Sequence, residues 1–365
     1  MKDAVESLPA SWYCDRTIYQ IEREKIFAKQ WIYAANLCEL PGPGDYITTE
    51  IAGYPIVIIK QDNDEISAFH NVCRHRAAPL LDEPQGKLLT SSLSCKYHGW
   101  TYNTTGELVS APYFDCSKWC DRDKYSLFSV KTAVFNGLIF VNLSEESASF
   151  FKTHAELVDK ISSSDSNFKE YTFHSKMVRE GNFNWKVWIE GYQECYHCPT
   201  IHPVFLKDFL LQKYNIDNHQ LFSSHSCERR VESSSGAFSG LWLWVYPNLG
   251  LPVYEPAYYT LIVNPLDVDR TQLTYTFHFR NGASEETINH FLEFVDQITK
   301  EDITICEAVQ KNLAAGIFKN GYLNPVRENG VVYFQSLIWA AVGGITANEQ
   351  LPLLGEQTRA VAGVM

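Results

Sequence analysis

Two short Cys–His pairs are the residues of this chain whose types and spacing most directly indicate chemistry. Cys73 and His75 belong to the segment "CRHRAAPLL", and Cys95 and His98 belong to "CKYHGW". Thiolate sulfur and imidazole nitrogen are side-chain ligands of zinc sites and of iron–sulfur clusters. The two pairs therefore predict a metal centre.

Zinc is the simpler interpretation of two cysteines and two histidines, but their order is wrong for a zinc finger. Zinc fingers place the cysteines together and the histidines together, on a hairpin and a following helix. Here each half of the motif contributes one cysteine and one histidine. That order fits a [2Fe–2S] cluster in which two thiolates bind one iron and two imidazoles bind the other. A Rieske cluster is therefore the prediction, with a zinc ribbon as the alternative.

Two histidines further along the chain form a second candidate site. His197 and His202 lie in "NWKVWIEGYQECYHCPTIHP", whose apolar spacing predicts a helix closed by Pro199. A proline interrupts a helix, which would let both imidazoles converge on one point. Two histidines and one carboxylate on one face of Fe(II), with open positions left, form the arrangement that activates O2. The carboxylate must come from another part of the chain.

The Cys–His pairs lie in a segment with the pattern of an all-β domain. Short β-branched runs, broken by Gly, Pro and the polar turn "QDNDE", predict strands, and "NTTGE" predicts a hairpin turn. We expect residues 38–145 to form the [2Fe–2S] domain, with both pairs on its loops. A helix is expected before it, over residues 18–35.

The remainder of the chain alternates between helix and strand patterns. "FFKTHAELVDKI" predicts a helix, whereas "SGLWLWVYP", "YYTLIVNPL" and "QLTYTFHFR" predict strands. A long amphipathic helix is expected over residues 284–315. The mixture indicates an α+β fold, an antiparallel sheet flanked by helices, that carries the mononuclear iron. Residues 1–37 and 146–365 are assigned to this catalytic domain.

Composition and charge exclude several classes of protein. Hydrophobic residues at 45% and charged residues at 20% are globular values, and 365 residues are enough for two domains. A net charge of -12 argues against binding to nucleic acid or to an anionic membrane surface. No signal peptide or membrane-spanning run is recognisable, so reduced cysteines in the cytoplasm are expected.

The wording "CRHRAAPLL … CKYHGWTYNTTGEL" resembles the cluster-binding signature of the Rieske non-haem iron oxygenases, in their oxygenase (alpha) subunit. The resemblance implies that Cys73 and Cys95 hold one iron of the cluster and that His75 and His98 hold the outer iron. The connector between the two loops is slightly longer than is common in the family. We interpret it as a longer connector that leaves all four ligands in place.

The same resemblance completes the second site. It implies a mononuclear Fe(II) at His197 and His202, with O2 as co-substrate. It also assigns the carboxylate to Asp302 in "TKEDITICEAVQ", on the long helix. Glu301 is the competitor, because adjacent helix positions point about 100° apart and only one can face the iron. A solvated helix face is the purely structural alternative for both.

Glu194 precedes His197 by about one helical turn, which predicts that the two share a helix face. In the family an acidic residue here links a cluster histidine of a neighbouring subunit to a histidine of the mononuclear iron. The resemblance thus implies a path for the electron from the neighbour's His98 through Glu194 to His197. Most members have Asp at this place. Glu resembles the branch of choline, carnitine and glycine betaine monooxygenases, which acts on quaternary ammonium compounds.

The chain also implies partners. It contains no strand–turn–helix with a GxGxxG motif, so NAD and flavin are not expected to bind to it. The resemblance implies a separate reductase, carrying flavin, an iron–sulfur centre or both, that draws electrons from NAD(P)H. It further implies a homotrimer, a closed head-to-tail ring in which the cluster of one subunit serves the iron of the next.

A quaternary ammonium substrate would require an aromatic cage, since rings attract such cations by cation–π interactions. The segment "LWLWVYPNLGLPVYEPAYY" supplies the candidates Trp242, Trp244, Tyr246, Tyr254 and Tyr258. Strand alternation puts the first three on one face. Such a stripe is also typical of a sheet core, and a neutral aromatic or terpenoid-like substrate is the alternative ligand.

A different class of function would be electron transfer without catalysis. A stand-alone Rieske ferredoxin is much shorter than this chain and lacks equivalents of His197, His202 and Asp302. Since all the expected ligands are present, the sequence favours an oxygenase that hydroxylates a carbon next to nitrogen or next to an alcohol.

Overall fold

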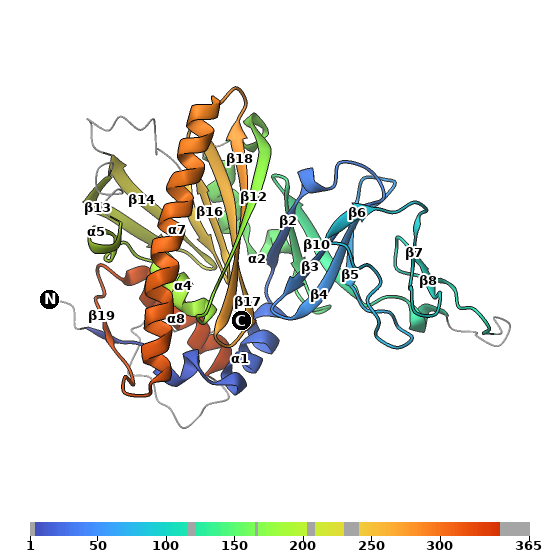
Figure 1. Cartoon of the computed structure of the whole chain (residues 1–365), viewed down its shortest axis with the longest axis horizontal. Coiled ribbons are helices and arrows are strands. Elements are labelled where there is room, and N and C mark those ends of the chain that lie inside the picture. Colours follow the sequence, from blue (N-terminus) through green and yellow to red (C-terminus); the bar gives the residue numbers. More distant parts are fainter. Residues whose placement is uncertain (1–3, 115–121, 165–166, 203–208, 230–240, 344–365) are drawn as a thin grey trace. The chain divides into compact units, whose positions relative to one another are not determined.

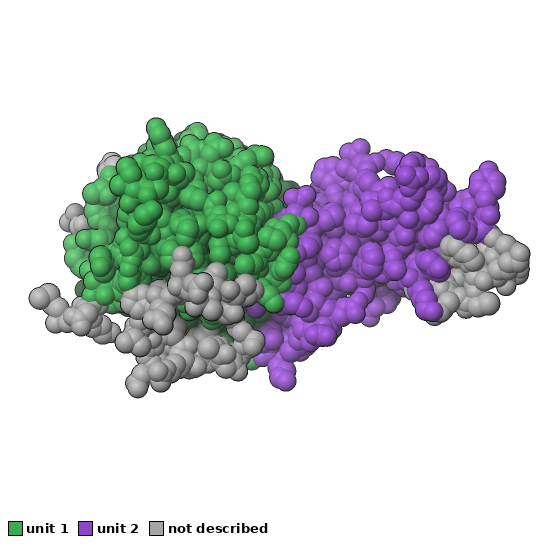
Figure 2. All heavy atoms as spheres, turned by 90° about the horizontal axis from the view of Figure 1, so that it is seen from below, with its two compact units in different colours: residues 1–26, 154–365 green, residues 27–153 purple. Residues whose placement is uncertain are grey.

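The chain divides into two units, drawn in different colours in Figure 2. One consists of Met1–Ile26 together with His154–Met365, and the other is Phe27–Thr153. Each has its own large antiparallel sheet (Figure 1). This is a computed structural model, and it describes residues 4–114, 122–164, 167–202, 209–229 and 241–343.

The sheet of the unit Phe27–Thr153 has seven strands in the order β2-β11-β10-β5-β4-β3-β6. β11 is buried along its whole length and β4 at its centre, as the apolar sequences "LIFVN" and "YPIVIIK" require. The strands are β2 (Ile32–Asn36), β3 (Asp45–Ile51), β4 (Tyr54–Lys60), β5 (Ile66–His70), β6 (Gln85–Lys87), β10 (Ser129–Phe135) and β11 (Leu138–Asn142).

A three-stranded sheet of β7 (Ser92–Ser94), β8 (Thr101–Asn103) and β9 (Leu108–Ser110) completes this unit. The turn between β8 and β9 contains Gly106, whose φ is +87°. A Cβ atom there would lie 2.4 Å from the Phe69 ring, so the close approach and the backbone both require glycine. One core joins the two sheets and includes both cluster cysteines: Val57, Ile59, Phe69, Cys73, Leu93, Cys95, Trp100, Tyr102 and Leu108.

The helix predicted over residues 18–35 is wrong in its second half. α1 covers only Arg16–Glu22, a π-helical turn follows at Arg23–Phe27, and Ile32–Asn36 is the strand β2. β2 pairs antiparallel with β11, and all its residues are buried. Pairing with a distant strand overrides the local periodicity, and it makes the unit begin earlier than the predicted residue 38.

The sheet of the other unit also has seven strands, in the order β12-β18-β17-β16-β15-β14-β13. α7 (Glu285–Ala314) lies across this sheet (Figure 1). Its residue Phe291 contacts the rings of Tyr254, Tyr259, Phe277 and Phe279. Buried positions recur along α7 at helical spacing, which is the amphipathic pattern that predicted it: Ile288, Phe291, Val295, Thr299, Cys306 and Gln310.

The N-terminus of α7 is capped by Ser284, whose hydroxyl accepts a hydrogen bond from the Thr287 N–H. The strands of this sheet are β12 (Tyr171–Gly181), β13 (Phe209–Asn218), β14 (Phe222–Arg229), β15 (Leu241–Val245), β16 (Leu249–Val253), β17 (Ala257–Asp267) and β18 (Arg270–Arg280).

Shorter elements complete the described part of the chain. No helix within it is long and apolar enough to cross a membrane. The remaining helices and strands are β1 (Val5–Glu6), η1 (Ala10–Tyr13), η3 (Leu37–Glu39), η4 (Arg122–Tyr125), α2 (Phe150–Thr153), α3 (Ala155–Ser162), η5 (Phe168–Glu170), α4 (Trp185–Tyr192), α5 (Cys198–Ile201), β19 (Tyr322–Leu323) and α8 (Asn329–Val342).

Candidate metal centres and substrate cavity

The two Cys–His loops share one construction. The loop after β5 contains Cys73, whose carbonyl accepts a hydrogen bond from the Ala77 N–H at 3.0 Å. The loop between β7 and β8 contains Cys95, whose carbonyl accepts one from the Gly99 N–H at 2.9 Å. The donor residue has a positive φ in both loops, 57° at Ala77 and 72° at Gly99. Each loop is thus a tight turn that presents one cysteine and one histidine.

The cysteines and the histidines of the two loops are arranged as like pairs. Cys73 and Cys95 are both buried, and burial together with the neighbouring Cys73 thiol raises the pKa of Cys95. The rings of His75 and His98 lie with their centroids 4.5 Å apart. Two sulfurs on one side and two imidazoles on the other match the ligand division of a Rieske cluster.

One buried atom tests whether a cluster fits. The Nδ1 atom of His75 is buried and has no hydrogen-bond partner in the described structure. The indole of Trp100 stacks on the same ring at 4.9 Å and holds its orientation. A buried polar atom without a partner is costly, and an iron ligand bond would remove that cost. The donor set and this orphaned nitrogen therefore fit a [2Fe–2S] cluster.

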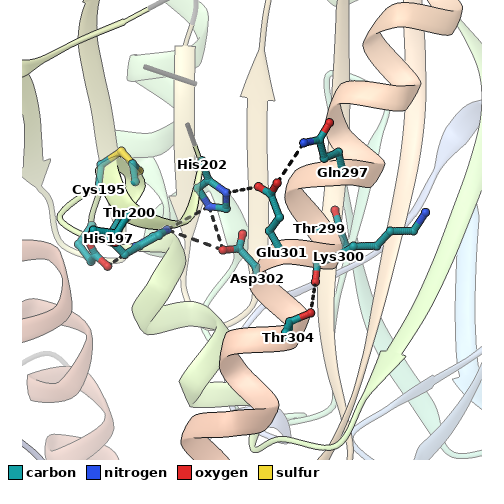
Figure 3. Close-up of polar contacts among 12 residues, drawn as sticks. Cys195, His197, Thr200, His202, Gln297, Thr299, Lys300, Glu301, Asp302 and Thr304 are labelled. Atoms are coloured by element: carbon teal, nitrogen blue, oxygen red, sulfur yellow. Dashed lines mark hydrogen bonds and ion pairs between the residues drawn. A yellow bond between two sulfur atoms is a disulfide. The ribbon is translucent and has the colours of Figure 1, made fainter. Parts of the chain in front are cut away.

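Three ligand atoms converge in the other unit (Figure 3). The Nε2 atoms of His197 and His202 are 3.3 Å apart. The Oδ1 atom of Asp302 lies 3.0 Å from Nε2 of His202 and 3.7 Å from Nε2 of His197. Two imidazole nitrogens and one carboxylate oxygen, pointing at one position, fit a single Fe(II) and leave further positions open.

The other ring nitrogen of each histidine contacts a second carboxylate. The Nδ1 atom of His197 contacts Oε1 of Glu194, and Nδ1 of His202 lies 2.7 Å from Oε2 of Glu301. Burial lowers the pKa of His202, but the hydrogen bonds and charges of Asp302 and Glu301 outweigh it, so its pKa is raised overall. Carboxylates in this position orient ligand imidazoles and fix their tautomer.

Asp302 and Glu301 therefore occupy different positions, although they are adjacent on α7. Asp302 faces the point where the histidine Nε2 atoms meet, whereas Glu301 reaches the far side of the His202 ring (Figure 3). The Glu301 carboxylate also accepts a hydrogen bond from Gln297 Nε2 at 3.0 Å. Sequence spacing treated Glu301 only as a competing ligand and missed this supporting contact.

The segment before the iron ligands differs from the predicted helix. α4 ends at Tyr192, so Glu194 lies beyond the helix and does not share a helix face with His197. The Glu194 carboxylate instead accepts a hydrogen bond from the His197 backbone N–H at 3.2 Å. Pro199 lies in the first turn of the short helix α5 and does not close a longer one. The two iron histidines flank α5, and this makes their rings converge.

Two cysteines bracket this turn. Cys195 and Cys198 are joined by a disulfide, although reduced cysteines were expected from the sequence (Figure 3). Both also line the cavity described next. A second closely spaced pair in the sequence, Cys116 and Cys120, lies outside the described residues.

A cavity of about 140 Å³ adjoins the three converging ligands. Its remaining lining consists mainly of aromatic and aliphatic side chains: Trp188, Gly191, Tyr192, Glu194, Cys195, Cys198, Tyr214, His225, Trp242, Pro252, Tyr254, Tyr259, Leu261, Tyr275, Phe294, Val295, Ile298 and Thr299. A larger hollow of about 640 Å³, beside the end of α7, contains none of the three ligands.

The five aromatic residues proposed for a cage are divided by the structure. Trp242 and Tyr254 line the cavity. Trp244 contacts the ring of Phe334 on α8 as well as Tyr246, and Tyr258 stacks on His278 at 4.4 Å. Alternate residues on a strand are about 7 Å apart, so a stripe extends past a small cavity into the core. Trp244, Tyr246 and Tyr258 are accordingly packing residues here.

Several cavity tyrosines were missed by the sequence analysis. Tyr259 and Tyr275 lie on neighbouring strands, β17 and β18, whose pairing sets Leu261 opposite Tyr275. Strand alternation indicates which residues share a face, but not which face α7 covers. Of these tyrosines, Tyr192 could have been predicted from the sequence to lie near the iron site, because it belongs to the same motif as Glu194.

Two family models match this chain. Residues 30–132 match the Rieske [2Fe-2S] domain, and residues 168–235 and 225–344 match the catalytic domain of the ring hydroxylating alpha subunit. The matched segments include all seven predicted metal ligands: Cys73, His75, Cys95, His98, His197, His202 and Asp302.

Curated relatives cover most of the chain. It is 28% identical to the carnitine monooxygenase oxygenase subunit of Acinetobacter pittii, over 92% of this chain and 95% of the relative. It is 26% identical to the chloroplastic choline monooxygenase of Amaranthus tricolor, over 89% and 75%. The glycine betaine monooxygenase oxygenase subunit of Pseudomonas aeruginosa is 34% identical over 57% of this chain and 48% of the relative.

Solved structures of Rieske oxygenases resemble this chain over most of its length. The quaternary ammonium Rieske monooxygenase CntA in complex with L-carnitine has a TM-score of 0.81 at 27% identity, over 93% of this chain and 96% of that one. A further structure, described as revealing inter-subunit electron transfer in carnitine oxidation, has a TM-score of 0.84 with the same coverage. Naphthalene 1,2-dioxygenase from Rhodococcus, at 19% identity and a TM-score of 0.75, shares the fold.

Proposed function

Because this chain belongs to the Rieske non-haem iron oxygenases, as an oxygenase (alpha) subunit, we propose that it hydroxylates a quaternary ammonium compound. The observation that carries the proposal is the aromatic cavity immediately beside His197, His202 and Asp302. Relatives named for carnitine, glycine betaine and choline support the same substrate class.

The cation would be held by the chain's own rings. Trp242 and Tyr254 are the cage candidates that line the cavity, and each cation–π contact contributes about 0.5–2 kcal/mol. The carboxylates of Glu194 and Asp302 lie in the same lining and add negative charge. Together these groups would hold a methyl or methylene carbon of the substrate next to the iron ligands.

The metals supply what side chains cannot. A mononuclear Fe(II) at His197, His202 and Asp302 would bind and activate O2, and a [2Fe–2S] cluster at the Cys–His loops would deliver electrons one at a time. In the balanced reaction one C–H bond becomes C–OH, and the second oxygen atom leaves as water after two electrons and two protons are taken up. A hydroxylated N-methyl group collapses to formaldehyde and a demethylated amine. A hydroxylated alcohol carbon gives an aldehyde hydrate.

The electrons require partners. We infer a separate reductase with flavin, an iron–sulfur centre or both, which takes electrons from NAD(P)H in the cytoplasm. We also infer a homotrimer in which His98 of one subunit approaches Glu194 of the next. The contact between Glu194 and the His197 ring supports the part of this path that lies within one chain.

The proposed relay is tested by Glu194→Ala, which leaves all metal ligands in place. With excess Fe(II) present, we expect turnover to fall at least about 10-fold, because the link to His197 is lost. Steady-state turnover with a matched count of NAD(P)H and product measures this. A variant with full coupled turnover would exclude the relay.

A single-turnover experiment tests the substrate class. Chemically reduced, iron-replete protein is exposed to 18O2 with choline, L-carnitine, glycine betaine or a neutral aromatic control, and products are identified by mass spectrometry. We expect a demethylated amine or an aldehyde from at least one trimethylammonium compound. Product from the neutral control alone would reject the substrate class, and oxidation of the metals without any product would do the same. Iron analysis separates an oxygenase, with about three Fe per chain, from an electron carrier with about two.

A further inference from the structure

A line of hydrogen-bonded side chains runs from the exposed Asn218 at the surface to the substrate cavity. Its members lie on β13, on β14, immediately after α4 and at the start of α8, and it ends at a tyrosine that lines the cavity. Gln193 and Ser223 are fully buried, and His225 is 6% exposed. The line runs from Asn329 through Asn218, Ser223, Gln193 and His225 to Tyr214.

The end of the line at Asn329 fixes the direction of every bond in it. The backbone carbonyl of Asn329 can only accept, and it accepts from Nδ2 of Asn218 at 3.2 Å. The Oδ1 atom of Asn218 then accepts the hydroxyl hydrogen of Ser223 at 2.8 Å. With its one hydrogen used, Ser223 accepts from Nε2 of Gln193 at 3.1 Å. The Gln193 amide therefore turns its carbonyl oxygen towards His225.

The directions of the bonds at the cavity end, at His225 and Tyr214, follow in the same way. Gln193 Oε1 lies 2.9 Å from Nε2 of His225, so the imidazole must donate from Nε2. Burial lowers the pKa of His225 to about 3, so the ring is neutral and its Nδ1 atom can only accept. Nδ1 lies 2.7 Å from the Tyr214 hydroxyl, which must therefore donate its hydrogen to His225.

Tyr214 consequently offers the cavity only an acceptor. A phenol has one hydrogen, and in Tyr214 that hydrogen is donated to His225 and is not available to the substrate. The neighbouring Tyr192 also has its one hydrogen committed, but it donates to the backbone carbonyl of Leu243 at 3.1 Å, and Leu243 is not part of the cavity lining. Of the two hydroxyl groups, the one of Tyr214 is bonded to a side chain, His225, that itself lines the cavity.

We propose that Tyr214 is a specificity-determining residue, whose oriented oxygen accepts a hydrogen bond from a hydroxyl group of the substrate. This inference rests on the proposed function and narrows it to quaternary ammonium compounds that carry a hydroxyl. An analogue without the hydroxyl would leave the Tyr214 oxygen without a donor. An analogue that has only acceptor groups at this position would place a partial negative charge against the Tyr214 oxygen and would be repelled.

Matched ligand pairs test the inference. Choline is compared with ethyltrimethylammonium, and L-carnitine with γ-butyrobetaine, because each pair differs only in a hydroxyl. Dissociation constants are measured by calorimetry on the metal-loaded enzyme, before O2 is added. We expect wild-type protein to favour the hydroxylated member of at least one pair by about 10-fold, the equivalent of one buried hydrogen bond.

Two tyrosine variants then locate the effect. Tyr214→Phe keeps the ring and removes the acceptor, so the ratio should fall to about one; Tyr192→Phe, the matched control in the same cavity, should leave the ratio at its wild-type value. The cluster absorbance and iron content verify that each variant folds. A wild-type ratio near one, or a preference that survives in Tyr214→Phe, overturns the inference. If no quaternary ammonium compound binds at all, the proposed function itself fails, and the inference fails with it.

Discussion

The residues that form the two metal centres of this chain differ greatly in how far apart they lie in the sequence. In the unit Phe27–Thr153, each cluster loop is shaped by hydrogen bonds within that loop, such as Gly99 to Cys95. In the other unit, the iron ligands come from the turn around α5 and from α7, and the contact between His202 and Glu301 spans 99 positions. A local centre can be recognised from spacing, whereas a distributed one depends on how a helix packs on a sheet.

Their supporting residues differ in the same way. The cluster histidine His75 is held by stacking on Trp100, a residue of the neighbouring loop. The iron histidines are held by carboxylates, Glu194 and Glu301, one from each of the two segments that form the site. Aromatic packing suits a buried cluster, while carboxylates at Nδ1 orient both imidazoles and direct their Nε2 atoms at a metal.

The largest expected effect is at the distributed centre. Asp302→Ala removes the one carboxylate at the point where the histidine nitrogens meet. We expect loss of about one iron per chain and a fall in turnover of at least about 100-fold, with the cluster spectrum unchanged. Metal analysis and visible absorption measure this. Asp296→Ala is the control, because Asp296 lies on the same helix but pairs with Arg179 and Lys300. Equal iron loss in both variants would contradict the assignment.

A substitution at a cluster cysteine should affect only the [2Fe–2S] site. Cys95→Ser removes a buried thiolate ligand, so we expect loss of the cluster's sulfide and visible absorption while the mononuclear iron is retained, since the two sites lie in separate units. Sulfide analysis and electron paramagnetic resonance measure this. The exposed Cys38 in the same unit supplies the control variant Cys38→Ser. Simultaneous loss of both metals would mean that the centres are not independent.

A smaller effect is expected from the carboxylate behind His202. Glu301→Ala removes the partner of Nδ1 but leaves the three converging atoms in place. We expect the affinity for Fe(II) to fall about 10- to 100-fold, with activity restored by excess iron. Fe(II) titration of the apoprotein measures this, and the exposed Glu293 on the same helix supplies the control Glu293→Ala. If Glu301 were itself the ligand, excess iron would not restore activity.

The smallest effect concerns stability against acid. Burial lowers the pKa of His278 to about 4, below its ordinary value of 6.5. Its neutral form therefore contributes stability that is fully present above pH 6.5 and is lost as the pH falls towards 4, by at most about 1.4 kcal/mol per pH unit. Denaturant unfolding of wild type and His278→Phe at pH 7.5 and 5 isolates this contribution. We expect the wild type to lose more stability between the two pH values, and parallel losses would contradict the burial argument.

Much of the fold was readable from the sequence because its signals are local. The β-branched runs of β3, β4 and β5 and the amphipathic spacing of α7 predicted those elements in the right places. β2 was misread, because its helical periodicity is overridden by pairing with β11. The end of α4 was also misread, because the turn that follows it is held by side-chain bonds from Glu194, not by backbone propensity.

The sequence by itself determined the chemistry: the types and spacing of Cys73, His75, Cys95 and His98, the histidine pair and the candidate carboxylates on the long helix. These are properties of short segments, which carry their ligands wherever they fold. Only the tertiary structure decided that Asp302 and not Glu301 faces the converging nitrogens, since this depends on the rotation of α7. It also decided which rings line the cavity and which way the Tyr214 hydroxyl points, because those depend on contacts among β13, β14, β18 and α7 that no local pattern specifies.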